Sequence, residues 1–181
     1  MQSYCKSGYR DTVRRLTTGS HFGRSVLRWD ALGRGVYFSR VTGETPGPGF
    51  NDISEIVYVD ATTLEQHVVR SGIIGEIQAI SSTGAHVLVL RNRTLVGSSY
   101  ERDLLRIALS SGAELVLLTR ELLQYASYSP TEMQTFFVTS IPASPSAQYK
   151  YEYLDAGGTR RTLSNIEQEA TFDLFFPYPP D

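Results

Sequence analysis

The sequence predicts an all-β protein in which three similar four-stranded units follow one another, with one extra strand at each end. Apolar or alternating runs of about four to nine residues are separated by Gly, Pro, Ser, Asn or Asp, which is typical of antiparallel strands. No long segment has the periodicity of a helix. The runs recur in a fixed order at steps of 51, 48 and 44 residues, and four strands per period of about this length indicate a β-propeller.

Each unit begins with a hairpin and continues with two more strands. The hairpin strands are expected at residues 26–29 and 35–39, 76–80 and 86–90, and 124–128 and 135–138. A polar loop leads to a third strand, expected at residues 55–59, 104–109 and 148–153. A tight turn leads to the fourth, expected at residues 65–69, 114–119 and 159–164. The units span approximately residues 22–72, 73–121 and 122–165 of a single domain, residues 1–181.

Two segments extend the pattern beyond these units. Residues 8–18 look like an additional fourth strand, and residues 166–181 begin like a new first strand. Propellers typically have about four to eight blades, whereas this chain supplies three complete ones. The expected architecture is therefore a partial or minimal propeller, either a small closed ring or an open arc. An open arc exposes blade faces and strand edges that need a covering partner.

Trp29, Ile80 and Tyr128 end the first strand of the three hairpins. Large side chains at the same place in each repeat are expected to lie near the packing layer between neighbouring blades. Asp30 follows Trp29 at the turn, where its carboxylate is expected to accept hydrogen bonds from backbone amides.

The repeat resembles the TolB-type propeller repeat, a relative of the WD-type repeat. In that family a strand ending near an aromatic residue leads into a Ser-Pro-Asp-Gly-like turn, and a Gly-x-x-x-Leu-Thr ending closes the unit. The turns at residues 29–33, 81–84 and 129–132 follow this pattern in degenerate form, as do the endings at residues 12–17, 114–119 and 158–164. The resemblance implies a propeller fold and a habit of binding other proteins, and it implies no reaction.

The sequence carries no recognisable catalytic, metal or cofactor motif. Its three histidines and its one cysteine, Cys5, have no neighbours at metal-ligand spacing. The Gly-x-Ser-x-Gly nucleophile elbow is absent, and the glycine-rich residues 43–49 are not followed by the Lys-Ser/Thr of a phosphate loop. Several carboxylates gather in the first unit, but the sequence places no two of them within reach for acid–base work. We therefore expect no enzyme, no cofactor and no metal.

These features favour a non-enzymatic protein-interaction module, an accessory or scaffolding subunit of a larger complex, membrane-bound or not. Two alternatives stay open: a small complete propeller that binds a small ligand or a sugar, and the propeller part of a hydrolase. A net charge of −2 argues against nucleic acid as a partner. The sequence shows no secretory signal and no transmembrane run, so the cytoplasm is expected by default, while the TolB resemblance also fits the periplasm.

Partner contacts are expected at the two ends of the chain and on the blade faces. Aromatic side chains dominate interface hot spots, and arginine binds carboxylates through two hydrogen bonds. The expected contact residues are Arg14, Arg15, Phe172, Phe175, Phe176 and Tyr178. In the third unit, Arg160 and Arg161 occupy positions equivalent to Arg14 and Arg15. They are interpreted either as charge on a solvated outer edge or as ligands for a partner's carboxylates.

Overall fold

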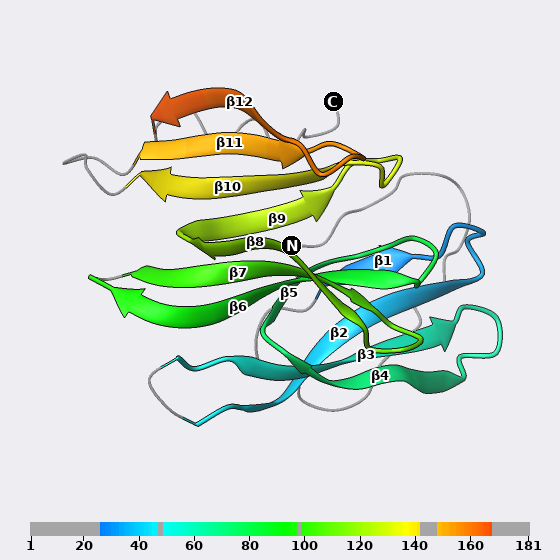
Figure 1. Ribbon diagram of the computed structural model, residues 1–181. Coiled ribbons are helices and arrows are strands. Elements are labelled where there is room, and N and C mark those ends of the chain that lie inside the picture. Colours follow the sequence, from blue (N-terminus) through cyan, green and yellow to red (C-terminus); the bar gives the residue numbers. More distant parts are fainter. Residues whose placement is uncertain (1–25, 47–48, 98, 142–147, 168–181) are drawn as a thin grey trace.

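A computed structural model describes residues 26–46, 49–97, 99–141 and 148–167 (Figure 1). These residues form twelve strands and no helix, and the strands pair into three four-stranded antiparallel sheets. The predicted all-β class is confirmed. The described part of the chain accordingly contains no helix long and apolar enough to cross a membrane. The predicted leading strand, residues 8–18, and residues 168–181 of the trailing segment lie outside the described residues.

The strands follow the chain order within each sheet. The first sheet contains β1 (Leu27–Trp29), β2 (Gly35–Glu44), β3 (Asp52–Asp60) and β4 (Gln66–Ile74). The second contains β5 (Glu76–Ile80), β6 (His86–Val96), β7 (Ser99–Ala108) and β8 (Glu114–Glu121). The third contains β9 (Leu123–Tyr128), β10 (Thr135–Ile141), β11 (Gln148–Leu154) and β12 (Arg160–Glu167). Figure 1 shows the second sheet between the other two.

The second strand of each sheet is longer than the apolar runs alone predict. β2 was expected to end at Ser39 and β6 at Leu90, but they continue to Glu44 and Val96. Some of the added residues are charged and face an opposite charge across the ladder, as Arg91 of β6 faces Asp103 of β7. Arg40, for example, pairs with Glu55 of β3 both in register and as an ion pair. Opposite charges on neighbouring strands stabilise pairing, so the ladder extends beyond the apolar stretch.

Strand β6 explains how one sheet packs on two neighbours. Its side chains alternate between the faces, as in any strand, and four consecutive residues are almost fully buried. Val87 and Val89 belong to a core shared with Ile56 of the first sheet. Leu88 and Leu90 belong to a second core, shared with the third sheet. An uninterrupted apolar run is what a strand buried on both faces requires.

The registers confirm that Trp29, Ile80 and Tyr128 occupy equivalent positions in the three hairpins. Trp29 pairs with Val36, Ile80 pairs with Val87 and Tyr128 pairs with Thr135.

Their expected common place in the packing layer is wrong for Trp29, which is 53% exposed, whereas Ile80 is 3% exposed. The reason is position along the arc. β5 packs against β2 and β3, and β9 packs against β6 and β7, but no described sheet precedes β1.

Candidate interaction surfaces

The three hairpin turns share one backbone geometry. In each, the residue after the first strand accepts a hydrogen bond at its carbonyl from the amide three residues on: Gly33 to Asp30, Gly84 to Ser81 and Glu132 to Ser129. The donor residue in each turn has a positive φ, between 59° and 67°. Glycine adopts this conformation freely, whereas Glu132 does so at a cost of roughly 1 kcal/mol. A non-glycine residue held in this region needs a compensating interaction.

Side chains at the first position fix these turns. Oδ1 of Asp30 accepts hydrogen bonds from the amides of Leu32 (3.1 Å) and Arg34 (2.7 Å), and Oδ2 accepts one from the Tyr58 hydroxyl (3.0 Å). Burial opposes the charged form of Asp30, but these hydrogen bonds outweigh it and lower the pKa of its carboxyl. The expected amide-binding role of Asp30 is therefore confirmed. The Ser81 hydroxyl accepts from the amides of Ala85 and His86 in the same way.

The turns are also linked to one another across the three sheets. The Ala31 amide donates to the Ser82 carbonyl at 2.9 Å. The Ser82 amide in turn donates to Oε1 of Glu132 at 2.6 Å, and Nη2 of Arg28 lies 3.5 Å from the same oxygen. The Glu132 carboxylate therefore contacts both other sheets, which supplies a physical reason for its strained backbone. This turn cluster, Arg28, Ala31, Ser82 and Glu132, runs across all three sheets on the side of the arc where the hairpin turns lie.

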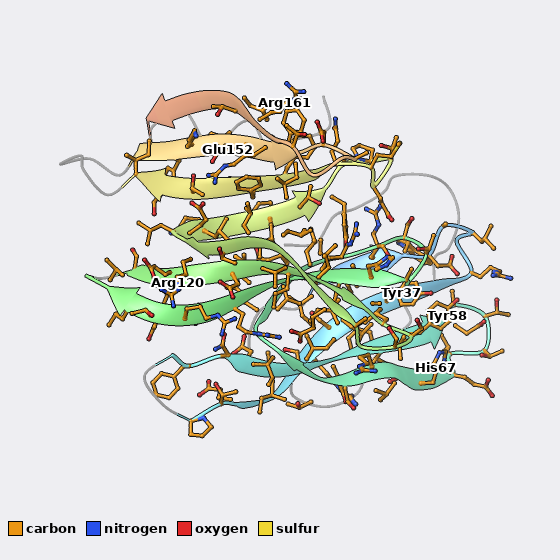
Figure 2. All side chains as sticks on the ribbon, in the orientation of Figure 1. Tyr37, Tyr58, His67, Arg120, Glu152 and Arg161 are labelled. Atoms are coloured by element: carbon orange, nitrogen blue, oxygen red, sulfur yellow. The ribbon has the colours of Figure 1, made fainter. Side chains whose placement is uncertain are left out.

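An aromatic ladder lies on the first sheet near these turns (Figure 2). The ring of Tyr58 lies 4.9 Å from that of Tyr37 and 5.3 Å from that of His67, measured between centroids. The Tyr37 hydroxyl reaches the Thr83 carbonyl at 3.5 Å, so the ladder touches the turn of the next sheet. Cross-strand aromatic pairs of this kind stabilise sheets. The His67 ring lies on the exposed strand β4 and forms the outer member of this ladder.

The carboxylate of Glu152 is buried between the second and third sheets, with its side chain 1% exposed. It accepts hydrogen bonds from Nε and Nη2 of Arg160 at 2.8 and 2.6 Å, and Nζ of Lys150 lies 2.7 Å from it. Thr139 completes the set with a hydroxyl at 3.2 Å. Burial opposes ionisation, but the two cations outweigh it and lower the pKa of Glu152 to about 2.

Arg160 connects this buried group to the second sheet. Its Nη1 lies 2.7 Å from Glu121 on β8, and its guanidinium lies over the Phe137 ring at 5.3 Å. Glu152 and Glu121 both raise the pKa of Arg160. Arg160 lies on the edge strand β12 and is partly exposed, and the carboxylates that it contacts in the structure belong to this chain. Arg161 differs: it is 59% exposed, and its Nε lies 3.5 Å from Asp155.

Three carboxylates of the first two sheets, Glu44, Asp52 and Glu76, lie close enough for the charges of the other two to act on Asp52. Asp52 is influenced by Glu76 and Glu44, and burial together with these two charges raises the pKa of its carboxyl. Glu76 itself lies 3.5 Å from Arg102. Among the described residues there is no group of three or more His, Cys, Asp or Glu side chains that could hold a metal ion.

The third sheet presents an aromatic face on the side turned away from the second sheet. Phe137 and Leu154 belong to the core between these sheets, so the residues that alternate with them point the other way. We call this the aromatic face, and it consists of Tyr125, Phe136, Val138, Tyr149, Tyr151 and Tyr153. The Phe136 and Tyr153 rings are 5.8 Å apart.

The first sheet has a corresponding face at the other end of the arc. Phe38, Val57 and Val59 form an apolar cluster, and Ile56 points instead into the core shared with the second sheet. The registers align Val57 and Val59 with Leu105 and Ile107, which pack toward the first sheet. Both ends of the arc are therefore built from positions that pack against another sheet elsewhere in the molecule.

The residues expected from the sequence to contact partners cannot be compared with these surfaces. Arg14, Arg15, Phe172, Phe175, Phe176 and Tyr178 all lie outside the described residues. The turn cluster and the buried Glu152 were not anticipated. The alternation Lys150-x-Glu152 in an apolar strand was the only available signal for the latter, and alternation alone does not say which face is buried.

Comparison with known proteins identifies the fold. No protein-family model and no curated protein matches the chain. Among solved structures, TolB from Acinetobacter baumannii is similar with a TM-score of 0.51 and 17% identity, over 86% of this chain and 35% of that one. An acylaminoacyl peptidase from Pyrococcus horikoshii is similar with a TM-score of 0.51 and 9% identity, over 78% of this chain and 24% of that one.

The similarity to propeller structures and the three four-stranded sheets together show that the protein is a partial β-propeller. Its degenerate repeat is TolB-like, as the turn and strand-ending motifs predicted. The chain spans about a third of the length of TolB and about a quarter of that of the peptidase.

Proposed function

We propose that this protein is a non-enzymatic interaction module, a partial propeller that serves as an accessory or scaffolding subunit of a larger assembly. The observation that carries the proposal is the character of the two end faces. Each repeats, position by position, a face that is packed against a neighbouring sheet elsewhere in the arc. A propeller sheet is stabilised chiefly by such neighbours, so these faces suit contact with further strands, supplied by the end segments of the chain or by a partner.

The polar surfaces support the same proposal. The most deeply buried carboxylates are held by arginines of the same chain: Asp103 lies 2.5 Å from Arg93, and Glu152 lies 2.6 Å from Arg160. Carboxylates paired in this way stabilise packing, and the lowered pKa of Glu152 makes that group a poor proton donor at neutral pH. Under the proposal the partner contacts lie in the segments that contain Arg14 and Arg15 and, toward the other end, Phe175, Phe176 and Tyr178.

The mass of the native species tests the proposal. The chain, expressed in its own host with a small affinity tag, should elute in a defined complex heavier than its 20.2 kDa monomer, measured by light scattering. A variant lacking residues 175–181 should leave the complex while keeping its thermal midpoint. Leu115→Ser, at a side chain 49% exposed on the second sheet, is the matched control and should stay bound. A native species that is monomeric at 20.2 kDa would contradict the proposal.

A further inference from the structure

The aromatic face of the third sheet matches a packed face of the second sheet residue by residue. Leu90 pairs with Leu104 in the second sheet, and Val138 pairs with Tyr151 at the same register in the third. Leu90 and Leu104 are 1% and 0% exposed because the third sheet covers them. The equivalent pair, Val138 and Tyr151, is 9% and 7% exposed although it faces away from the second sheet.

The strand that covers such a face is always the first strand of the next sheet. β5 packs across β2 and β3, and β9 packs across β6 and β7. At the third sheet the same arrangement would place a strand across β10 and β11. The face it would meet is aromatic, with Tyr125 still 42% exposed at one side.

The chain could place its own next strand on this face through a one-residue connection, as it does between the first and second sheets and between the second and third. One residue, Gly75, separates β4 from β5, and one residue, Leu122, separates β8 from β9. β12 ends at Glu167, so the same connection would start a strand at Glu169. Residues 169–174 alternate apolar and polar side chains, with Ala170, Phe172 and Leu174 on one side. This is the pattern of a strand with one buried face.

We propose that residues 169–174 of this chain form the first strand of a fourth sheet and pack on the aromatic face through Ala170, Phe172 and Leu174. The chain continues for fourteen residues beyond β12, which is enough for this strand and a short extension. Phe172 then belongs to the core of its own chain, and Leu174, the last residue of the strand, stands at the place of Ile80 and Tyr128, which end β5 and β9. Phe175, Phe176 and Tyr178 follow the strand and remain available to a partner.

Chemical cross-linking of the isolated chain tests this placement without a partner. In a Cys5→Ser background, Phe136→Cys is combined with Phe172→Cys and treated with a short bis-maleimide reagent. The aromatic face and the proposed strand should then be joined within one chain, detected by mass spectrometry of the intact protein and of its peptides. The matched control combines Phe172→Cys with Leu115→Cys, which is exposed on the outer strand of the second sheet.

The expected result is a within-chain cross-link to position 136 at least tenfold more abundant than that to position 115. Equal yields for the two pairs, or cross-linked dimers as the main product, would overturn the proposal, and dimers would indicate a second copy on this face. Because Phe136→Cys alters the face itself, a second pair, Ser140→Cys with Phe172→Cys, repeats the test from a polar position on β10. A monomeric native species would contradict the proposed function and leave this intramolecular result unchanged.

Discussion

At the scale of single residues, Glu152 is a charged side chain buried between two sheets. By register it occupies the position that Leu105 has in the second sheet and Val57 in the first, and both of these residues are almost fully buried. An unpaired carboxylate there would be costly, and the arginine and lysine beside it offset that cost. The buried pair also joins two sheets, because Arg160 reaches Glu121 on β8.

Replacing Glu152 with Gln should therefore destabilise the fold, and the effect should depend on pH. The folded-state pKa of about 2 lies below the ordinary value of 4.5, so the ionised group stabilises the folded state. This contribution is complete above pH 4.5 and is lost as the pH falls toward 2. We expect a loss of roughly 3 kcal/mol at pH 7, shrinking as the pH is lowered through this window. Denaturant unfolding at several pH values measures this difference in unfolding free energy between the variant and the parent protein. Glu65→Gln, in the turn between β3 and β4, is the control.

A similar loss at pH 7 and near pH 2 would show that the Glu152 variant acts through packing and that its charge contributes little. An unchanged stability at pH 7 would show that the buried ion pair contributes nothing net, which is known for some buried pairs.

Trp29 and Ile80 show that equivalent positions need not contribute equally. Ile80→Ala removes a side chain from the core between the first two sheets and should cost about 2–5 kcal/mol in unfolding free energy. Trp29→Ala, at a side chain 53% exposed, should cost about 1 kcal/mol or less. The same denaturant experiment on both variants checks the pair. A larger loss for Trp29 than for Ile80 would mean that the tryptophan is covered in solution.

At the scale of elements, the hairpin turns combine a shared backbone with different surroundings. Gly33 and Gly84 both have positive φ, 67° and 66°, in equivalent turns. A Cβ at Gly33 would meet no atom within 4 Å, whereas one at Gly84 would lie 2.3 Å from the Tyr37 ring. The turn that contains Gly84 therefore packs directly against the aromatic ladder of the first sheet. Among the described residues, no side chain packs against Gly33 in the same way.

This difference gives a matched pair of substitutions. Gly33→Ala should cost roughly 1–2 kcal/mol, from backbone strain alone. Gly84→Ala should cost clearly more, because Tyr37 must also move and its contacts with Tyr58 and Thr83 are disturbed. Thermal midpoints of the two variants provide the measurement, supported by near-ultraviolet circular dichroism of the tyrosines. Equal losses would mean that the Tyr37 ring adjusts freely.

The elements that could be predicted from the sequence are those fixed by local pattern. The hairpins, their turns and the order of strands follow from alternation and from Gly, Asp and Ser at the turns. The ends of β2 and β6 could not be located, because both strands continue past the apolar run through mixed residues, and part of that ladder depends on cross-strand pairs such as Arg40 with Glu55. The exposure of Trp29 and the burial of Glu152 depend on which sheet lies beside them, and no single strand encodes that information.

At the scale of the whole molecule, the arc is a row of sheets in which each contacts its nearest neighbours. One core joins the first and second sheets, and a separate core joins the second and third. The turn cluster adds polar links between the sheets on the side where the hairpin turns lie, through Ser82 and Glu132. In such a row, stability is close to a sum of sheet and interface contributions.

Weakening one interface should therefore loosen the arc locally. Phe137 is 1% exposed in the core between the second and third sheets, and Phe137→Ala should cost roughly 3–5 kcal/mol there. We expect faster amide hydrogen exchange in β9 to β12 and little change in β2 and β3, whose core with the second sheet is untouched. Ile56→Ala, in the core between the first and second sheets, is the matched variant. It should speed exchange in the first sheet and leave β10 and β11 unchanged.

Hydrogen exchange followed by mass spectrometry at peptide resolution compares the two variants. Uniform acceleration in all three sheets for both variants would show that the arc opens as one cooperative unit, and that contacts beyond the two cores hold it together.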